Sequence, residues 1–128
     1  MVRCFNNRSV ITTLSQCLLK IAIAAHGSSP ATASALLREL NASQPMLVDR
    51  LIKSIPDMFP KAYRWVGEME EISEFVGEGE GEIHRGLANL YRRIEGSLGD
   101  GDVGGDVGVL TQFVAEAKAT RADAAADL

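Results

Sequence analysis

The sequence predicts an all-α protein, a bundle of about five helices. Apolar residues recur at intervals of three and four along most of the chain, which is the spacing of one face of a helix. Prolines and glycines divide the chain into segments of helical length. No useful run of alternating apolar and polar residues indicates a strand.

The first predicted helix runs from Val10 to Ala25 and is followed by His26-Gly27-Ser28. Its apolar residues, at positions 11, 14, 18, 21, 22 and 25, share one face. His26 lies at the end of this helix, where a basic group interacts favourably with the helix dipole. Ser29 and Pro30 then indicate an N-cap followed by proline at the first helical position, so a second helix is predicted over Pro30–Leu40.

Pro45 restarts the chain in a short apolar segment that ends near Ile52, and Ile55–Phe59 is predicted as a turn because it contains Pro56. Pro60 begins a further helix, which is predicted to run to Val76.

Glycines at 77, 79 and 81 interrupt the helical pattern, and the next predicted helix covers Glu82–Leu98. This helix carries the clearest amphipathic stripe of the chain, formed by Ile83, Leu87, Leu90, Ile94 and Leu98.

The chain is divided here into four parts by composition. Residues 1–14 form an N-terminal segment, and residues 15–98 form the helical domain. Residues 99–108 are rich in Gly and Asp, which predicts a flexible linker. Residues 109–128 are rich in alanine, which predicts a weakly anchored terminal helix.

Composition excludes several classes of protein. The 128 residues fit one domain, and a net charge of −4 disfavours a general nucleic-acid binder, which needs a basic surface. Two cysteines, Cys4 and Cys17, are too few for a disulfide scaffold and favour a reducing compartment. No apolar run reaches the ~18 residues of a membrane span. We therefore expect a cytoplasmic protein, with mitochondrial targeting by the acid-free N-terminus as the alternative.

Two patterns in the sequence resemble ligand-binding loops but do not have the side chains that such loops need. A phosphate loop at Gly77–Gly81 would be filled by carboxylates from Glu78, Glu80 and Glu82, and no strand precedes it. Aspartates at 100, 102 and 106 have calcium-loop spacing, but Thr111 stands where a bidentate glutamate is needed. No His/Cys spacing indicates a metal site. We therefore predict no metal site, no cofactor bound by this chain and no identifiable catalytic residue.

The segment from Pro60 to Ile72 is the best candidate for a binding site. Lys61, Arg64, Trp65 and Glu68 follow one another at i, i+3, i+4 and i+7, so they share a helical face. Two cations near a helix N-terminus indicate an anion site, and we predict Lys61, Arg64 and Glu68 as substrate-binding residues. The alternative is a solvated face on which the cations pair with Glu68 and Glu71 while Trp65 covers the core edge.

The sequence also carries a family resemblance. It rests on P-K-A-Y-R-W-V-G-E-M-E-E-I at Pro60–Ile72 and H-R-G-L-A-N-L-Y-R-R-I-E at His84–Glu95, with A-A-H-G-S-S-P-A-T-A and S-Q-P upstream. These segments resemble the C-terminal domain of phosphogluconate dehydrogenase-like, NAD(P)-dependent oxidoreductases, related to the β-hydroxyacid dehydrogenases, in their fungal form. The resemblance covers roughly Ser15 to Leu98.

The resemblance implies an all-α domain that closes a substrate cleft and forms a dimer. In this family a separate Rossmann domain binds NAD or NADP, so we expect the chain alone to be inactive. The implied partners are a second copy, a Rossmann domain in trans and a small hydroxy acid. The catalytic lysine of the family would fall in Met1–Leu14, where the sequence departs from the pattern, so it is not placed.

Two alternatives from other functional classes stay open. The chain could be a non-catalytic interaction module that forms a homodimer through the stripe of Ile83, Leu87, Leu90 and Ile94. It could also be an independent helical bundle that binds a small molecule.

Overall fold

The computed structural model describes residues 7–100 and 105–127, with side chains described for 15–99 and 105–127. The described part forms six α-helices and one short 3-10 helix, with no strand, which confirms the predicted all-α fold. The elements are α1 (Asn7–Ser28), α2 (Pro30–Ser43), α3 (Pro45–Met58), η2 (Phe59–Lys61), α4 (Ala62–Val76), α5 (Gly81–Asp100) and α6 (Asp106–Ala126).

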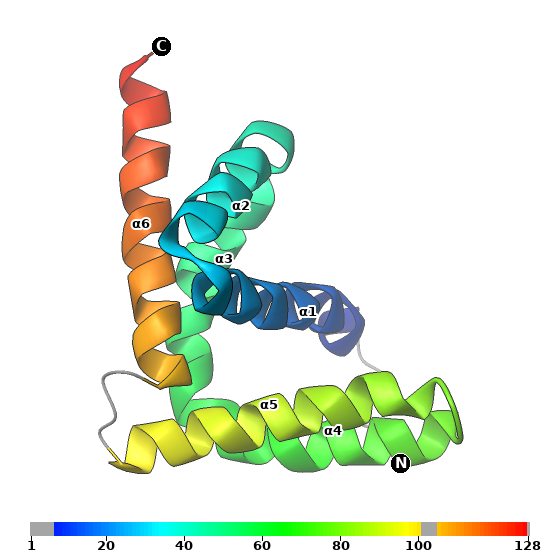
Figure 1. The fold of residues 1–128 in the computed structure, drawn as a ribbon. Coiled ribbons are helices and arrows are strands. Elements are labelled where there is room, and N and C mark those ends of the chain that lie inside the picture. The colour runs from blue at the N-terminus through cyan, green and yellow to red at the C-terminus, as the bar shows by residue number, and fades with distance from the viewer. Residues whose placement is uncertain (1–6, 101–104, 128) are drawn as a thin grey trace.

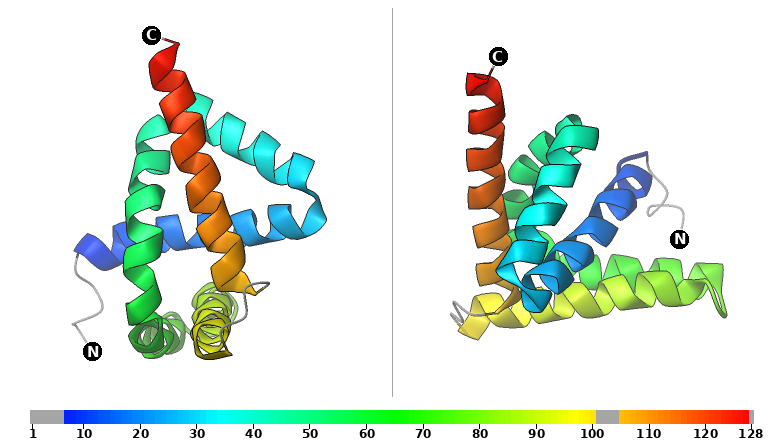
Figure 2. Two further views of the ribbon diagram at one scale, coloured as in Figure 1. Left: turned by 90° about the vertical axis from the view of Figure 1, so that its left-hand side faces the viewer. Right: turned by 45° about the horizontal axis from the view of Figure 1, so that its top comes forward.

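The helices form two groups (Figure 1). Helices α4 and α5 lie side by side as an antiparallel hairpin, which both views of Figure 2 also show. Helices α3 and α6 stand at one end of this hairpin, and α1 and α2 pack beside them. The core lies where the two groups meet. Its fully buried large side chains are Tyr91, Leu51, Ile55, Leu90, Ile94, Leu110 and Val48.

The predicted cap of α2 is confirmed. The Ser29 side chain accepts a hydrogen bond from the backbone N–H of Thr32 at 3.1 Å, and Pro30 occupies the first turn. Helix α1 is longer than predicted at both ends, so residues 7–14 of the assigned N-terminal segment are helical. His26 lies in the last turn of α1, as expected.

The turn predicted at Ile55–Phe59 is wrong, because α3 continues through Pro56 to Met58. Pro56 cannot donate a backbone hydrogen bond within the helix, but it lies on the exposed side. Ile55 and Met58 lie on the buried side of the same turn. Burial of two large apolar side chains outweighs one missing hydrogen bond, so the helix persists and α4 begins at Ala62 rather than Pro60.

The turn between α4 and α5 depends on its glycines. Gly77 and Gly79 have φ angles of 90° and 82°, a region that side chains with a Cβ rarely occupy. At Gly81 a Cβ would lie 2.5 Å from the backbone oxygen of Ser73, so the hairpin closes only around a residue without a side chain. The predicted break at 77–81 is thus confirmed as an exposed turn over Glu78–Glu80.

The C-terminal part differs from expectation. Helix α5 extends to Asp100 and α6 begins at Asp106, so the linker assigned to residues 99–108 was too long at both ends. The terminal helix is also not weakly anchored. It buries Leu110, Phe113, Val114 and Ala117 in the common core.

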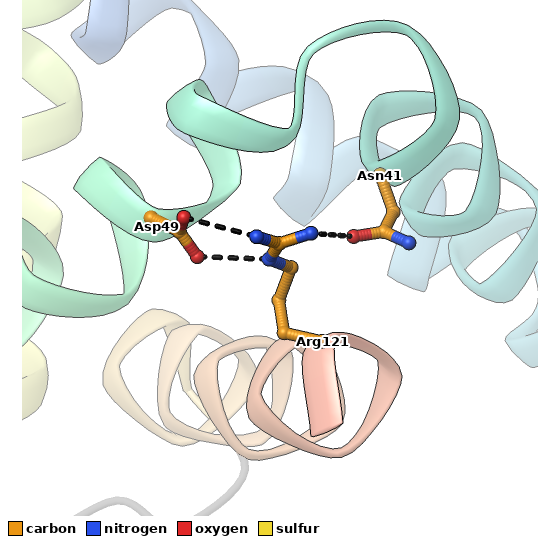
Figure 3. Close-up of polar contacts among 3 residues, drawn as sticks. All are labelled: Asn41, Asp49 and Arg121. Atoms are coloured by element: carbon orange, nitrogen blue, oxygen red, sulfur yellow. Dashed lines mark hydrogen bonds and ion pairs between the residues drawn. The ribbon is translucent and has the colours of Figure 1, made fainter. Parts of the chain in front are cut away.

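A polar cluster holds the second half of α6 (Figure 3). The Arg121 guanidinium donates to both carboxylate oxygens of Asp49 in α3, at 2.8 and 3.1 Å. It also donates to the side-chain oxygen of Asn41 in α2, at 3.2 Å. One side chain therefore ties α6 to two helices that precede it by more than half of the chain.

The apolar stripe of α5 faces inward. Leu87, Leu90 and Ile94 are buried within the single chain, and Ile83 is the exposed member of the four. The hypothesis that this stripe forms a homodimer interface is therefore wrong. Its residues are already covered by the core of the same chain.

Candidate functional site

A pocket of about 360 Å³ opens between the two groups of helices. This volume lies in the range of sites for small molecules. Helices α1, α3, α4 and α5, together with η2, contribute its walls. Its lining residues are Ser15, Gln16, Leu19, Arg50, Leu51, Ser54, Ile55, Asp57, Met58, Lys61, Trp65 and Tyr91.

Two polar side chains in the pocket wall are buried without a hydrogen-bond partner. Gln16 is 2% exposed and Tyr91 is fully buried. Within the described part of the chain, neither the Gln16 Oε1 atom nor the Tyr91 hydroxyl has a partner in a hydrogen bond of ordinary geometry, but the two side chains lie close enough for Gln16 to affect the pKa of Tyr91. Buried polar atoms are nearly always hydrogen-bonded, so these two atoms are exceptions within the described part of the chain.

Tyr91 is fixed by its neighbours. The Trp65 ring packs edge-on against the Tyr91 ring, with centroids 5.3 Å apart and planes at 86°. Burial raises the pKa of the Tyr91 phenol well above its usual range, and the charges of Cys17 and Glu68 act in the same direction. The nearby Gln16 side chain acts in the opposite direction. The phenol therefore stays protonated at neutral pH and is able to donate a hydrogen bond.

The mouth of the pocket carries charge. Arg50, Asp57 and Lys61 line it and are exposed to solvent. Two cations and one carboxylate leave a local charge of one positive unit, which favours an anionic group at the mouth. The apolar residues Leu51, Ile55 and Met58 are buried and line the wall.

The structure separates the three predicted substrate-binding residues. Lys61 lines the pocket, whereas Arg64 and Glu68 are exposed on α4 and are not among the lining residues. Among the described residues, no ion pair joins Lys61 or Arg64 to Glu68. Trp65 lies half-buried and packs against the core, as the alternative interpretation expected.

Sequence reasoning did not find three of the residues that define this pocket, Gln16, Arg50 and Tyr91. Gln16 lies on the opposite side of the first helix from its predicted apolar face, so the sequence pattern gave no signal for it. Tyr91 was recognised beside the stripe of its helix, but its place in a pocket wall depends on helices distant in sequence. No pattern in the sequence identified Arg50 as a pocket residue.

The glycine turn between α4 and α5 does not have the features of a phosphate loop. The glycine turn at 77–81 joins two helices and carries two glutamates, with Glu82 directly after it, so its backbone N–H groups are poorly suited to a phosphate. No group of three or more His, Cys, Asp or Glu side chains in the described part is arranged to hold a metal. None of the described helices has the length and apolar character needed to cross a bilayer.

The fold and the pocket define a helical domain with a small-molecule-sized site. Residues 28–94, more than half of the chain, match the domain of unknown function DUF1932. The chain therefore belongs to this family, which is known from the C-terminal region of β-hydroxyacid dehydrogenase-like proteins. The match covers Lys61, Arg64 and Glu68 and ends before α6. Neither the curated proteins nor the solved structures gave a significant match.

Proposed function

We propose that this chain is the helical substrate-cleft and dimerisation domain of an NAD(P)-dependent, phosphogluconate or β-hydroxyacid dehydrogenase-like oxidoreductase. A separate Rossmann domain would bind NAD or NADP and carry out hydride exchange with a small hydroxy acid. The observation that carries this proposal is the DUF1932 match over residues 28–94, since that domain occurs in the C-terminal region of such proteins.

The position of α4 supports a role in substrate binding. Lys61 lies at the mouth of the pocket, and Arg64 and Glu68 follow it along the exposed side of α4. No described ion pair neutralises Lys61 or Arg64. Cations that are not paired within their own domain are available to an anionic substrate held between two domains.

The homodimer is part of the proposal, but its interface would use a surface other than the buried α5 stripe. Exposed apolar side chains lie on the α4–α5 hairpin at Tyr63, Phe75, Val76 and Ile83. Size-exclusion chromatography with light scattering, with and without a Rossmann domain, measures whether the chain associates with itself.

The test of the proposal is reconstitution in trans. The purified chain is mixed with the separately produced Rossmann domain of a dehydrogenase that contains DUF1932, and NAD(P)H formation is followed with hydroxy acids. We expect association and turnover, and we expect Arg64→Glu to raise KM or lower kcat at least about tenfold, because it replaces a charged contact by repulsion.

Arg38→Glu is the matched control, since Arg38 is an exposed cation on α2 outside the pocket. The proposal fails if several such Rossmann domains neither bind the chain nor gain activity from it. The assignment of Arg64 fails separately if turnover is restored and both kinetic constants are the same in Arg64→Glu and in the control.

A further inference from the structure

We propose that the end of the α4–α5 hairpin binds a basic amphipathic helix of another protein. This end, the hairpin tip, comprises residues 74–83, which include the end of α4, the glycine turn and the start of α5. The inference goes beyond the proposed function, because such binding requires neither a Rossmann domain nor a substrate.

The hairpin tip is strongly acidic. It contains four glutamates and no Lys, Arg or His. Glu82 pairs with Arg85 at 3.4 Å, but no ion pair within the described part of the chain involves the other three, Glu74, Glu78 and Glu80. All three are exposed. Carboxylates without an intramolecular cation produce a local negative potential, which attracts a basic partner.

The hairpin tip also exposes apolar side chains. Phe75, Val76 and Ile83 are 60%, 45% and 57% exposed, and they lie on either side of the glycine turn. Glutamates directly precede Phe75 and Ile83 in the chain. Exposed apolar surface next to charged residues is typical of sites that bind other proteins. A partner that covers this surface therefore needs both apolar and basic side chains.

The backbone of the turn holds this surface in one conformation. The Gly77 N–H donates to the Ser73 carbonyl oxygen at 3.0 Å, and the Gly81 N–H donates to the Gly77 carbonyl oxygen at 3.0 Å. Figure 1 shows that the turn lies at the end of the hairpin remote from α3 and α6. A partner would therefore meet a surface that is already formed, which lowers the entropic cost of binding.

A basic amphipathic helix matches both properties of the hairpin tip. Its apolar stripe would cover the exposed apolar side chains, and the Lys or Arg residues beside the stripe would pair with the glutamates. A partner strand would need the edge of a sheet, and the described part of the chain contains no strand.

Other occupants conflict with the charge of the hairpin tip. A second copy bound tip to tip would bring the same carboxylates together, and like charges in an interface are unfavourable. The homodimer of the proposed function would therefore use the hairpin around Tyr63, outside the tip. An anionic membrane surface would also be repelled.

The test uses a dye-labelled peptide of leucine and lysine, about four helical turns long, with the leucines on one face. The full chain is titrated into this peptide at low salt, and fluorescence anisotropy is recorded. We expect saturable binding that weakens as salt is raised. Peptides with glutamate in place of lysine, or with serine in place of leucine, should bind at least about tenfold more weakly.

A charge variant assigns the polar contacts. Glu78→Gln combined with Glu80→Gln should weaken binding of the leucine–lysine peptide by about three- to tenfold at low salt. Glu39→Gln combined with Glu95→Gln is the matched control. It removes the same net charge from exposed positions of α2 and α5 that lie outside the hairpin tip.

An apolar variant assigns the other contacts. Ile83→Gln should weaken binding by about threefold or more, because it removes apolar surface that the peptide would cover. Ile21→Gln is the matched control, since Ile21 is 49% exposed on α1. All of these substitutions are at exposed positions, so the variants are expected to fold, and circular dichroism checks this.

Three results with the peptides would overturn the proposal. They are the absence of saturable binding, equal binding of the leucine–glutamate peptide, and equal effects of a tip variant and its control. Sedimentation of the chain alone supplies a fourth, since self-association that Ile83→Gln abolishes would show that a second copy covers the tip. None of these measurements depends on turnover, so the proposed function can fail while this inference holds, and the reverse.

Discussion

The α4–α5 hairpin and helix α6 are stabilised by different kinds of contact. The two helices of the hairpin are neighbours in sequence and contact each other along their length around a glycine turn (Figure 1). Helix α6 packs instead on α1, α2, α3 and α5, all of which precede it, and three of which lie far from it in sequence. The DUF1932 match includes the hairpin as far as residue 94 but none of α6.

A local sequence pattern is sufficient to predict packing only where the partner helix is adjacent in the chain. The α5 stripe is recognisable because its nearest partner, α4, is connected to it by a short turn. Helix α6 has a short apolar face followed by an alanine-rich half, and its anchoring depends on surfaces that other helices provide. The contribution of α6 to stability therefore depends on the other helices against which it packs.

The largest effect is expected where α6 enters the core. Leu110 is fully buried, so Leu110→Ala should lower the free energy of unfolding by about 2–5 kcal/mol. Leu98→Ala is the matched control, since Leu98 is 42% exposed. Urea unfolding followed by circular dichroism measures both. Equal effects of the two substitutions would show that α6 does not share the core.

The hairpin is best tested at its glycines. Gly81→Ala should lower the free energy of unfolding by about 1–3 kcal/mol, because its Cβ would meet the Ser73 carbonyl oxygen. Gly67 lies on the exposed side of α4, and a Cβ added there would have no other atom within 4 Å. Gly67→Ala should therefore stabilise the chain by about 0.5–1 kcal/mol. Opposite signs in thermal unfolding confirm the close approach at Gly81, and equal signs contradict it.

The Arg121 cluster should have a smaller effect. Arg121→Ala is expected to cost about 0.2–1 kcal/mol, because Asp49 is more than half exposed and solvent screens the pair. The cost should decrease as salt is raised. A double-mutant cycle with Asp49→Asn isolates the pair, and Arg85→Ala is a control at an exposed pair within α5. A coupling energy of zero at low salt would show that the pair of Arg121 and Asp49 does not stabilise the packing of α6.

The smallest effect concerns pH. Burial lowers the pKa of His84 below its ordinary value of 6.5, and its Nδ1 atom has no partner among the described residues. At His84 the unfolded chain therefore binds a proton more readily than the folded chain. The free energy of unfolding should fall as the pH is lowered from above the ordinary histidine pKa to below the pKa of His84 in the folded chain.

His84→Gln should reduce the loss of stability between about pH 7.5 and about pH 5.5, as measured by urea midpoints. His26→Gln, at the end of α1, is the control substitution. The same pH dependence in His84→Gln and in the unsubstituted chain would contradict this prediction.

The sequence by itself determined those features that depend on neighbouring residues. The Ser29–Pro30 start of α2, the break at Gly77–Gly81 and the all-α fold were all predictable, because capping, backbone freedom and helical periodicity are local properties. The cation at Lys61 was also predicted as a candidate binding residue, and it lies at the pocket.

Only the tertiary structure decided the rest. Because of the tertiary packing, Pro56 lies inside a helix, the α5 stripe forms part of the core of one chain, and α6 is anchored in that core. It also brought Gln16 and Tyr91, which are far apart in sequence, to the same pocket without hydrogen-bond partners among the described residues. The physical reason is that burial and hydrogen-bond satisfaction depend on which helices pack together, and no local pattern in the sequence encodes that choice.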